Sequence, residues 1–445
     1  MTSKAFTKAL IYAFLAATLV GCGGSVYETS TSEPEEVVVV EEASNEATDG
    51  EEQPADVMEG SSDNETQAAV VTAVDMVEGG AIDTTDLFTE RDLTQTVDTS
   101  DATHVTLSSG QDVEITSEGV YVISGSAEDV TMRVSAADTD KVQIVLDGAS
   151  ITNADAPCIY VVSADKVFVT TTEGTTSTLT VTDAFAADGD TTPDAVIFSK
   201  DDLVVNGLGT LVVSSSDNGI TCKDDLKVTG GTIVIDCASD GLEANDSVRI
   251  AGGDITITTP KDGVHVEYDE DDSVGFFYQC GGSLAIQAGD DGVHATTYVQ
   301  IDGGTLNINA AEAIEATVVQ LNGGDVEIYA TDDGINASWK SESIGTPTIE
   351  INGGNLVVSM AQGDTDALDS NGYLIVNGGT VDITAQFAFD FEYGAEMNGG
   401  TATVNGEQVT QITESMMGGG AMGGPGMGGG PMGGAPGGGF GGPGF

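Results

Sequence analysis

The sequence contains very few basic residues. Its 445 residues include 12 Lys and Arg against 73 Asp and Glu, which gives a formal net charge of −61. A chain this acidic repels the phosphates of nucleic acid, so nucleic-acid binding is excluded. Divalent cations and cationic surfaces are the charged partners that such a composition favours.

Helical periodicity and long apolar runs are also missing. No stretch places apolar residues at helical spacing, which disfavours leucine-rich and helical repeats. Beyond the first 22 residues, no segment is long and apolar enough to span a membrane. Apart from Cys22, the cysteines show neither metal-ligand spacing nor obvious pairs, so Cys158, Cys222, Cys237 and Cys280 are expected to be free, buried thiols.

What the chain does contain is a repeat. Gly-Gly pairs recur every 20 to 30 residues, beginning at Gly230, Gly252, Gly281, Gly303, Gly323, Gly353, Gly378 and Gly399. A base period of about 20–22 residues with occasional insertions is typical of a solenoid. Apolar residues alternate within each unit, as at Leu306 and Ile308, which indicates strands. The sequence therefore predicts an all-β, parallel β-helix in which the glycine pairs occupy a bend that needs positive φ.

A second motif, D-G-[I/V/L]-x-[A/V], follows the middle strand of each unit. Its first position holds Asn218, Asp240, Asp262, Asp291, Glu312, Asp333 and Asp366. Three residues later come Thr221, Glu243, His265, His294, Glu315, Asn336, Asp369 and Asp390. Equivalent positions of neighbouring coils lie about 4.8 Å apart, so the acids should form columns.

Aligned carboxylates repel one another by roughly 1 kcal/mol per pair in water, and by more where the effective dielectric is lower. The columns are therefore either fully solvated or hold cations, and oxygen ligands suit calcium. The candidate calcium ligands are Asp240, Glu243, Asp262, Asp291, Glu312, Glu315, Asp333, Asp366 and Asp369. Alternatively, each Asp caps its own backbone bend. His265 and His294 either fill the column or stack as a pair that could take a transition metal.

The ends of the chain have their own signals. Residues 1–22 resemble a lipoprotein signal peptide, with Lys4 and Lys8 before a short apolar stretch and a lipobox that ends at Cys22. Lipidation of Cys22 predicts a protein anchored to the cell membrane or outer membrane, on the extracellular face of the envelope. Residues 23–102 are expected to form an acidic, disordered tether, 103–410 the β-helix, and 411–445 a disordered Gly/Met/Pro-rich tail.

Several phrases resemble the bacterial carbohydrate-binding-domain family first described in cellulolytic clostridia. They are DKVQIVLDGASIT, SADKVFVTTTEGTTSTLT, AVIFSKDDLVVNGLGTLVV and DGVHVEYDEDDSVGFFYQCGG, and the resemblance covers roughly residues 103–405. It implies a right-handed parallel β-helix similar to pectate lyases, with calcium along the helix. It also implies display on the cell surface and binding to plant-type polysaccharides such as cellulose or polygalacturonate.

Two insertions indicate where a sugar would bind. Residues 268–279 and 338–348 leave the coil at the same point and carry Tyr268, Tyr278 and Trp339, whose rings suit sugar faces. The alternative is that these aromatic rings pack the loops onto the body. A lyase would need a base, and Lys261, beside Asp262, is the best candidate, although a surface lysine paired with the acids is the simpler interpretation.

These features together predict a lipid-anchored, non-catalytic protein that binds polysaccharide through a calcium-holding β-helix. The alternatives are a calcium-dependent polysaccharide lyase and a structural adhesin or matrix protein without glycan specificity. The sequence leaves the oligomeric state open.

Overall fold

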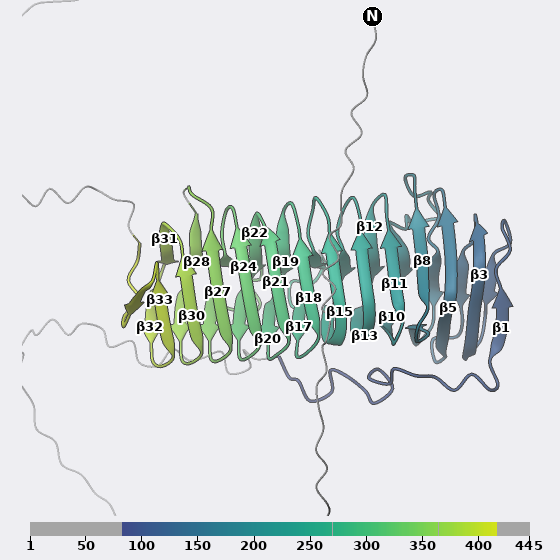
Figure 1. Cartoon of the computed structure of the whole chain (residues 1–445), viewed down its shortest axis with the longest axis horizontal. Coiled ribbons are helices and arrows are strands. Elements are labelled where there is room, and N and C mark those ends of the chain that lie inside the picture. The colour runs from purple at the N-terminus through teal and green to yellow at the C-terminus, as the bar shows by residue number, and fades with distance from the viewer. Residues whose placement is uncertain (1–81, 269, 364, 416–445) are drawn as a thin grey trace, which may run out of the picture. The chain divides into compact units, whose positions relative to one another are not determined.

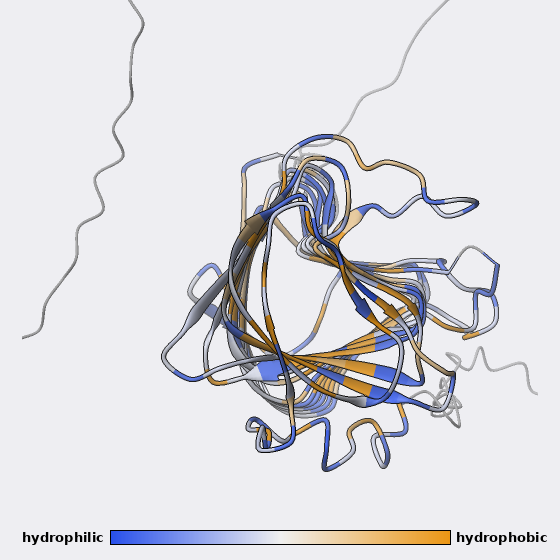
Figure 2. Cartoon of the chain, turned by 90° about the vertical axis from the view of Figure 1, so that its right-hand side faces the viewer, coloured by the Kyte–Doolittle hydropathy of each residue, from blue (hydrophilic) through white to orange (hydrophobic). Residues whose placement is uncertain are grey.

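The computed structural model describes residues 82–268, 270–363 and 365–415 (Figure 1). Within these ranges the chain forms 34 strands and no helix, and every coil-to-coil pairing is parallel except the last. Viewed along the stack, each coil is three-sided (Figure 2), and its buried apolar residues form one continuous core cluster. The predicted parallel β-helix is confirmed.

Each side of the coil builds one face of the stack. Four long strands bend around a corner and pair on both the first and the second face: β3 (Gly119–Glu128), β5 (Lys141–Asn153), β13 (Asp225–Asp236) and β15 (Ser247–Thr258). The first face comprises β1 (Thr103–Thr106), β3 (Gly119–Glu128), β5 (Lys141–Asn153), β7 (Lys166–Thr171), β10 (Asp202–Gly207), β13 (Asp225–Asp236), β15 (Ser247–Thr258), β17 (Phe276–Gln279), β20 (Tyr298–Ile301), β23 (Val318–Leu321), β26 (Thr348–Ile351), β29 (Tyr373–Val376) and β32 (Gly394–Met397).

The second and third faces complete the coil. The second face adds β8 (Thr176–Val181), β11 (Thr210–Ser214), β18 (Ser283–Gln287), β21 (Thr305–Ala310), β24 (Asp325–Ala330), β27 (Asn355–Met360), β30 (Thr380–Thr384), β33 (Thr401–Val404) and β34 (Glu407–Val409). The third face comprises β2 (Val113–Ile115), β4 (Met132–Ser135), β6 (Ile159–Ser163), β9 (Ala195–Ser199), β12 (Asn218–Cys222), β14 (Leu242–Ala244), β16 (Val264–Val266), β19 (Asp291–Ala295), β22 (Glu312–Ala316), β25 (Ile335–Ala337), β28 (Asp366–Ser370) and β31 (Phe387–Phe391).

The core is a set of aliphatic rows that run along the stack. On the second face Leu284, Leu306, Val326 and Leu356 pair in register and are at most 2% exposed. Their neighbours in each strand point outward, which is the alternation seen in the sequence. Because every coil repeats this pattern, each coil buries its apolar residues against the coils on either side.

The glycine corner has the conformation that the sequence predicts. The second glycine of all eight pairs has φ between +70° and +99°, a region that side chains other than glycine rarely adopt. Before four of the pairs stands an asparagine, and these asparagines form a ladder that the sequence analysis missed. The amide of Asn352 donates to Asn322 at 2.9 Å, that of Asn377 to Asn352 at 2.8 Å, and that of Asn398 to Asn377 at 3.0 Å.

Residues 82–102, which we call the strap, differ from the expected tether. They lie along the first face, where the carboxylate of Asp92 is 1% exposed and pairs with Lys166 at 3.5 Å and Lys227 at 3.7 Å. The amide of Asn206 donates to the carbonyl of Thr94 at 3.1 Å. The strap therefore belongs to the β-helix, because it supplies an ion-pair partner for two lysines that the first face buries.

The C-terminal boundary also differs slightly from the expected one. Strand β34 runs antiparallel to β33 and ends the second face. Beyond it, the hydroxyl of Ser415 accepts the backbone N–H of Ala388 at 3.1 Å, so residues 411–415 pack on the last coil. The lipobox, Cys22 and residues 416–445 lie outside the described residues. No helix in the described ranges has the length and hydropathy needed to cross a bilayer.

Three of the four cysteines match their prediction. Cys158, Cys222 and Cys237 are free and buried, whereas Cys280 is free but exposed. Cys280 directly follows β17 and precedes the Gly281 corner, so its side chain lies outside the core.

Candidate functional site

The acidic corner of each coil leads into the third face, and its residues line up as predicted. We call the first motif position the first column and the position three residues later the second column. The second column pairs in register from Thr221 through Glu243, His265, His294, Glu315, Asn336 and Asp369 to Asp390. The alignment of acidic positions is therefore confirmed.

The first column is fixed by hydrogen bonds between coils. The backbone N–H of Asp262 donates to the carboxylate of Asp240 at 3.2 Å, that of Asp291 to Asp262 at 3.0 Å, and that of Asp366 to Asp333 at 3.0 Å. These acids therefore do cap backbone N–H groups, but each one caps the bend of the next coil and not its own bend. Each bond occupies one carboxylate oxygen, so the other oxygen can face the second column.

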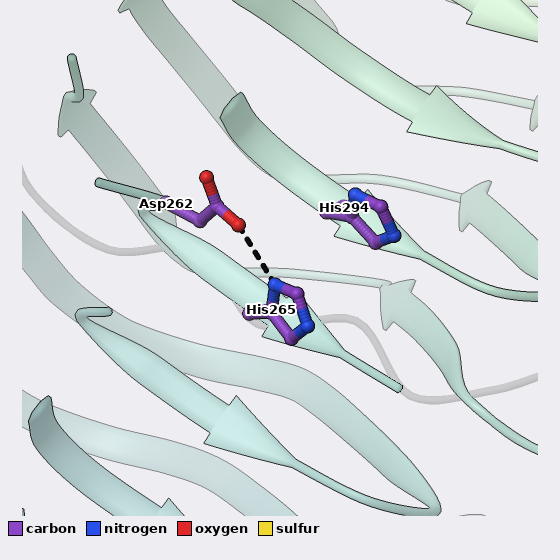
Figure 3. A group of neighbouring side chains, drawn as sticks. All are labelled: Asp262, His265 and His294. Carbon is purple, nitrogen blue, oxygen red and sulfur yellow. Dashed lines mark hydrogen bonds and ion pairs between the residues drawn. The ribbon is translucent and has the colours of Figure 1, made fainter. Parts of the chain in front are cut away.

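Two histidines occupy consecutive steps of the second column. The rings of His265 and His294 stack with centroids 4.8 Å apart and planes 13° apart (Figure 3). The Nδ1 atom of His265 lies 2.7 Å from the carboxylate of Asp262, and that of His294 lies 3.0 Å from Asp291. Of the two alternatives considered for these histidines, the structure shows the stacked pair, and each ring contacts an acid of the first column.

These bonds control the protonation of the histidines. Burial lowers the pKa of His294, but its hydrogen bonds with Asp291 and Glu315 outweigh burial and raise it to about 10. The pKa of His265 is also raised, because its hydrogen bond with Asp262 outweighs burial. Protonated histidines thus balance part of the acidic charge in this half of the columns.

In the following coil Lys340 pairs with Glu315 at 2.7 Å, but within the described ranges no ion pair involves Glu312 or Asp369. Burial and the charge of Glu315 raise the pKa of Glu312 to about 8. Burial and the charges of Asp333, Asp390 and Asp366 raise the pKa of Asp369 to about 7. The repulsion expected from stacked carboxylates is therefore concentrated at Glu312 and Asp369.

The two insertions meet on one side of the β-helix. Asp272, in the loop after β16, accepts the hydroxyl of Ser343 at 2.6 Å and the backbone N–H of Glu342 at 3.2 Å, both from the loop after β25. The expectation that both insertions project from the same side is confirmed. A cavity of about 350 Å³ lies next to the second column and is lined by residues that include His265, Glu267 and Tyr268. A separate cavity of about 490 Å³ lies on the second face and is lined by residues of β15, β18, β21, β24 and β27.

Trp339 lies in the second loop and is 48% exposed. Its two neighbours are tied to the second column. The hydroxyl of Ser338 donates to Glu315 at 3.0 Å, and Lys340 pairs with the same carboxylate at 2.7 Å. The indole is therefore placed at the edge of the acidic column by contacts on both sides of it.

Comparison with known proteins gives the family. The model of the carbohydrate-binding domain-containing protein family matches residues 109–367. The chain belongs to this family. A carbohydrate-binding domain-containing protein of Acetivibrio thermocellus is 41% identical over 204 residues, which cover 45% of this chain and 71% of the relative. A solved polysaccharide lyase-like protein from C. thermocellum, studied as a gadolinium derivative, is 27% identical with a TM-score of 0.41, and the match covers 60% of this chain and 99% of that one.

In this carbohydrate-binding domain, the two tyrosines predicted to contact sugar lie in different environments. Tyr268 lies on the first loop, where its hydroxyl donates to Glu270 at 3.1 Å. Tyr278 belongs instead to β17, is 5% exposed, and donates to Asp302 at 2.8 Å beneath the strap residue Phe88. Tyr278 is thus a packing residue of the first face, out of reach of a polysaccharide.

Lys261 lacks the environment of a lyase base. Its side chain is 57% exposed and pairs with Asp290 at 3.2 Å. This hydrogen bond raises the pKa of Lys261, which keeps the amine protonated, whereas a base must be neutral to accept a proton. The geometry agrees with the simpler interpretation of a surface ion pair.

One acid of the site was missed in the sequence. Glu267 has a carboxylate oxygen 3.3 Å from Nε2 of His265 and 3.9 Å from Nε2 of His294. It stands two residues after His265, so its side chain points the same way from the strand end. That spacing was the available signal.

Proposed function

We propose that the protein binds cellulose- or pectin-like polysaccharide, without cleaving it, where the second column meets the two insertion loops. The family supports carbohydrate as the partner. The observation that carries the proposal is the exposed indole of Trp339, whose neighbours Ser338 and Lys340 both contact Glu315. A flat, rigid apolar face beside hydrogen-bonding acids suits a sugar ring, which has apolar faces and hydroxyl edges. Tyr268 on the first loop would extend this contact.

Calcium is proposed at the steps of the columns that follow the histidines. Glu312, Asp333 and Asp369 offer only oxygen donors there, are partly buried, and have no ion pair with any basic residue that the structure describes, so they fit a hard divalent ion. Bound calcium would supply a positive charge that attracts uronate carboxylates. Such an ion would explain how a very negative protein holds an acidic glycan.

Lipidation of Cys22 would place this binding site on the extracellular face of the envelope, at the cell membrane or the outer membrane. The support is the order of basic residues, short apolar stretch and lipobox in the first 22 residues. The acidic segment that follows would then hold the β-helix away from the lipid surface.

The test is retention of the protein on insoluble cellulose and pectin. We expect Trp339→Ala to weaken retention roughly tenfold, because aromatic contacts contribute about 0.5–1.5 kcal/mol beyond area burial. Tyr393→Ala is the matched control, since Tyr393 is 52% exposed on the last coils, far along the chain from both loops. Equal retention of both variants, or no preference among sugars, would support an adhesin instead. Release of unsaturated uronates would support a lyase.

A further inference from the structure

The histidine step of the columns does not match calcium. Calcium takes oxygen ligands, whereas His265 and His294 present imidazole nitrogens, which suit zinc, copper, nickel and iron. Their side chains are 26% and 11% exposed, so they are neither free in solvent nor sealed in the core. At this step the residues favour a different ion from the one proposed for the other steps.

The donor atoms are already gathered. Ligand atoms of Asp262, His265 and His294 all lie within 4.8 Å of one another, and so do those of Asp262 and Asp291. The two acid–imidazole contacts measure 2.7 Å and 3.0 Å. Around tetrahedral zinc, with bonds of about 2.0–2.1 Å, ligand atoms lie roughly 3.4 Å apart. Side-chain shifts of less than an ångström or so would therefore convert two hydrogen bonds into four metal bonds.

The surroundings of the rings also have the features of a metal site. A ligating histidine usually donates its other ring N–H to a carboxylate, which fixes the ring. Glu267 provides such a carboxylate for His265, whose Nε2 atom is 3.3 Å away, while Nε2 of His294 lies 3.9 Å from the same oxygen. On the opposite side, the second oxygen of Asp262 is held by the backbone N–H of Asp291 at 3.0 Å.

We propose that Asp262, His265, Asp291 and His294 bind one divalent transition-metal ion, such as zinc, through two Nδ1 atoms and two carboxylates. Glu267 accepts the Nε2–H of His265 as a hydrogen bond in the metal-bound state and orients that ring. The ion replaces the two Nδ1 protons of the charged histidines. Binding therefore releases two protons and leaves the net charge of the four side chains unchanged. This site lies next to the proposed polysaccharide site, since Nδ1 of His294 is 3.3 Å from Glu315, but its four ligands do not include the aromatic residues Trp339 and Tyr268.

The test is calorimetric titration of the full chain with Zn²⁺ in the presence of excess Ca²⁺. We expect one strongly bound zinc per chain. His265→Gln and His294→Gln should each weaken it at least 100-fold, and Glu267→Gln by about 10- to 100-fold. His104→Gln is the matched control, since His104 is the one other histidine of the sequence and is exposed on β1. Cys280→Ser excludes binding by the exposed thiol.

Imidazole ¹⁵N chemical shifts give a readout that does not depend on affinity. With zinc, the Nδ1 signals of His265 and His294 should move to the metal-bound range while His104 does not change. Equal zinc affinity of His265→Gln and His104→Gln, or displacement of zinc by millimolar calcium, would overturn the proposal. If a histidine variant fails to fold, Glu267→Gln serves instead, because its carboxylate is 42% exposed.

Discussion

Asp369 shows what alignment does to a single carboxylate. It lies in the second column between Asn336 and Asp390, and burial together with neighbouring acids raises its pKa to about 7. A neutral residue at position 369 would make the metal-free protein more stable than an ionised carboxylate does. The position is therefore the most direct place to ask whether cations neutralise the column.

Asp369→Asn should stabilise the metal-free protein at alkaline pH. For an acid with a raised pKa in the folded state, stability is fully present below the unfolded pKa of about 3.9 and is lost as pH rises to about 7. Removing the charge should restore roughly 1–3 kcal/mol above that window, after allowance for solvent screening, and little near pH 4. Denaturant unfolding with chelator present measures this, and Asp382→Asn on the exposed side of β30 is the control.

Calcium should reverse that difference. If calcium sits beside Asp369, a concentration of about 100 times its dissociation constant adds about 2.7 kcal/mol to wild-type stability. Asp369→Asn should gain clearly less from the same addition, because it lacks one ligand charge. Equal gains in both proteins, measured by unfolding at fixed calcium, would place calcium elsewhere.

Among the structural elements, the strap neutralises buried positive charge on the first face through Asp92. Asp92→Ala leaves the buried Lys227 without its ion pair, while Lys166 keeps Asp202 at 3.1 Å, and breaking a buried pair in this way costs about 3–5 kcal/mol. We expect a loss of that size in the free energy of unfolding. Asp86→Ala, in the same strap but exposed, should change it by less than about 0.5 kcal/mol. Equal small losses would mean that the strap contributes little.

The asparagine ladder makes a second prediction at this scale. Asn352 both donates to Asn322 and accepts from Asn377, so Asn352→Ala removes two hydrogen bonds worth about 1 kcal/mol each. A drop of about 2 kcal/mol in unfolding free energy is expected. Asn355→Ala, an exposed residue of β27, is the matched control and should stay near wild type.

Some of these elements could be predicted from the sequence, and others could not. Gly-Gly corners and alternating strands are local patterns that repeat, so the coil and the alignment of His265 with His294 followed from spacing alone. The strap could not be predicted in this way, because Asp92 meets Lys166 and Lys227 across long stretches of chain and its segment has few apolar residues. Tyr278 was misplaced because an irregular loop hides where β17 begins.

For the whole molecule, a rigid stack carries the loops and the columns on the same side. The loops after β16 and β25 touch through Asp272 and Ser343, although coils lie between them. A ligand that spans several sugars could contact Trp339, Tyr268 and the intervening acids together. The length of a β-helix suits a polymer better than a small molecule, since its binding groups repeat along an axis.

The most direct measurement is titration of soluble pectin fragments into wild-type protein and Trp339→Ala, with calcium and again with chelator. We predict binding by the wild type in calcium, roughly tenfold weaker binding by Trp339→Ala, and loss of binding in chelator. Affinities that are equal in all of these conditions would contradict the account, because neither the exposed indole nor a cation in the acidic columns would then contribute to holding the sugar.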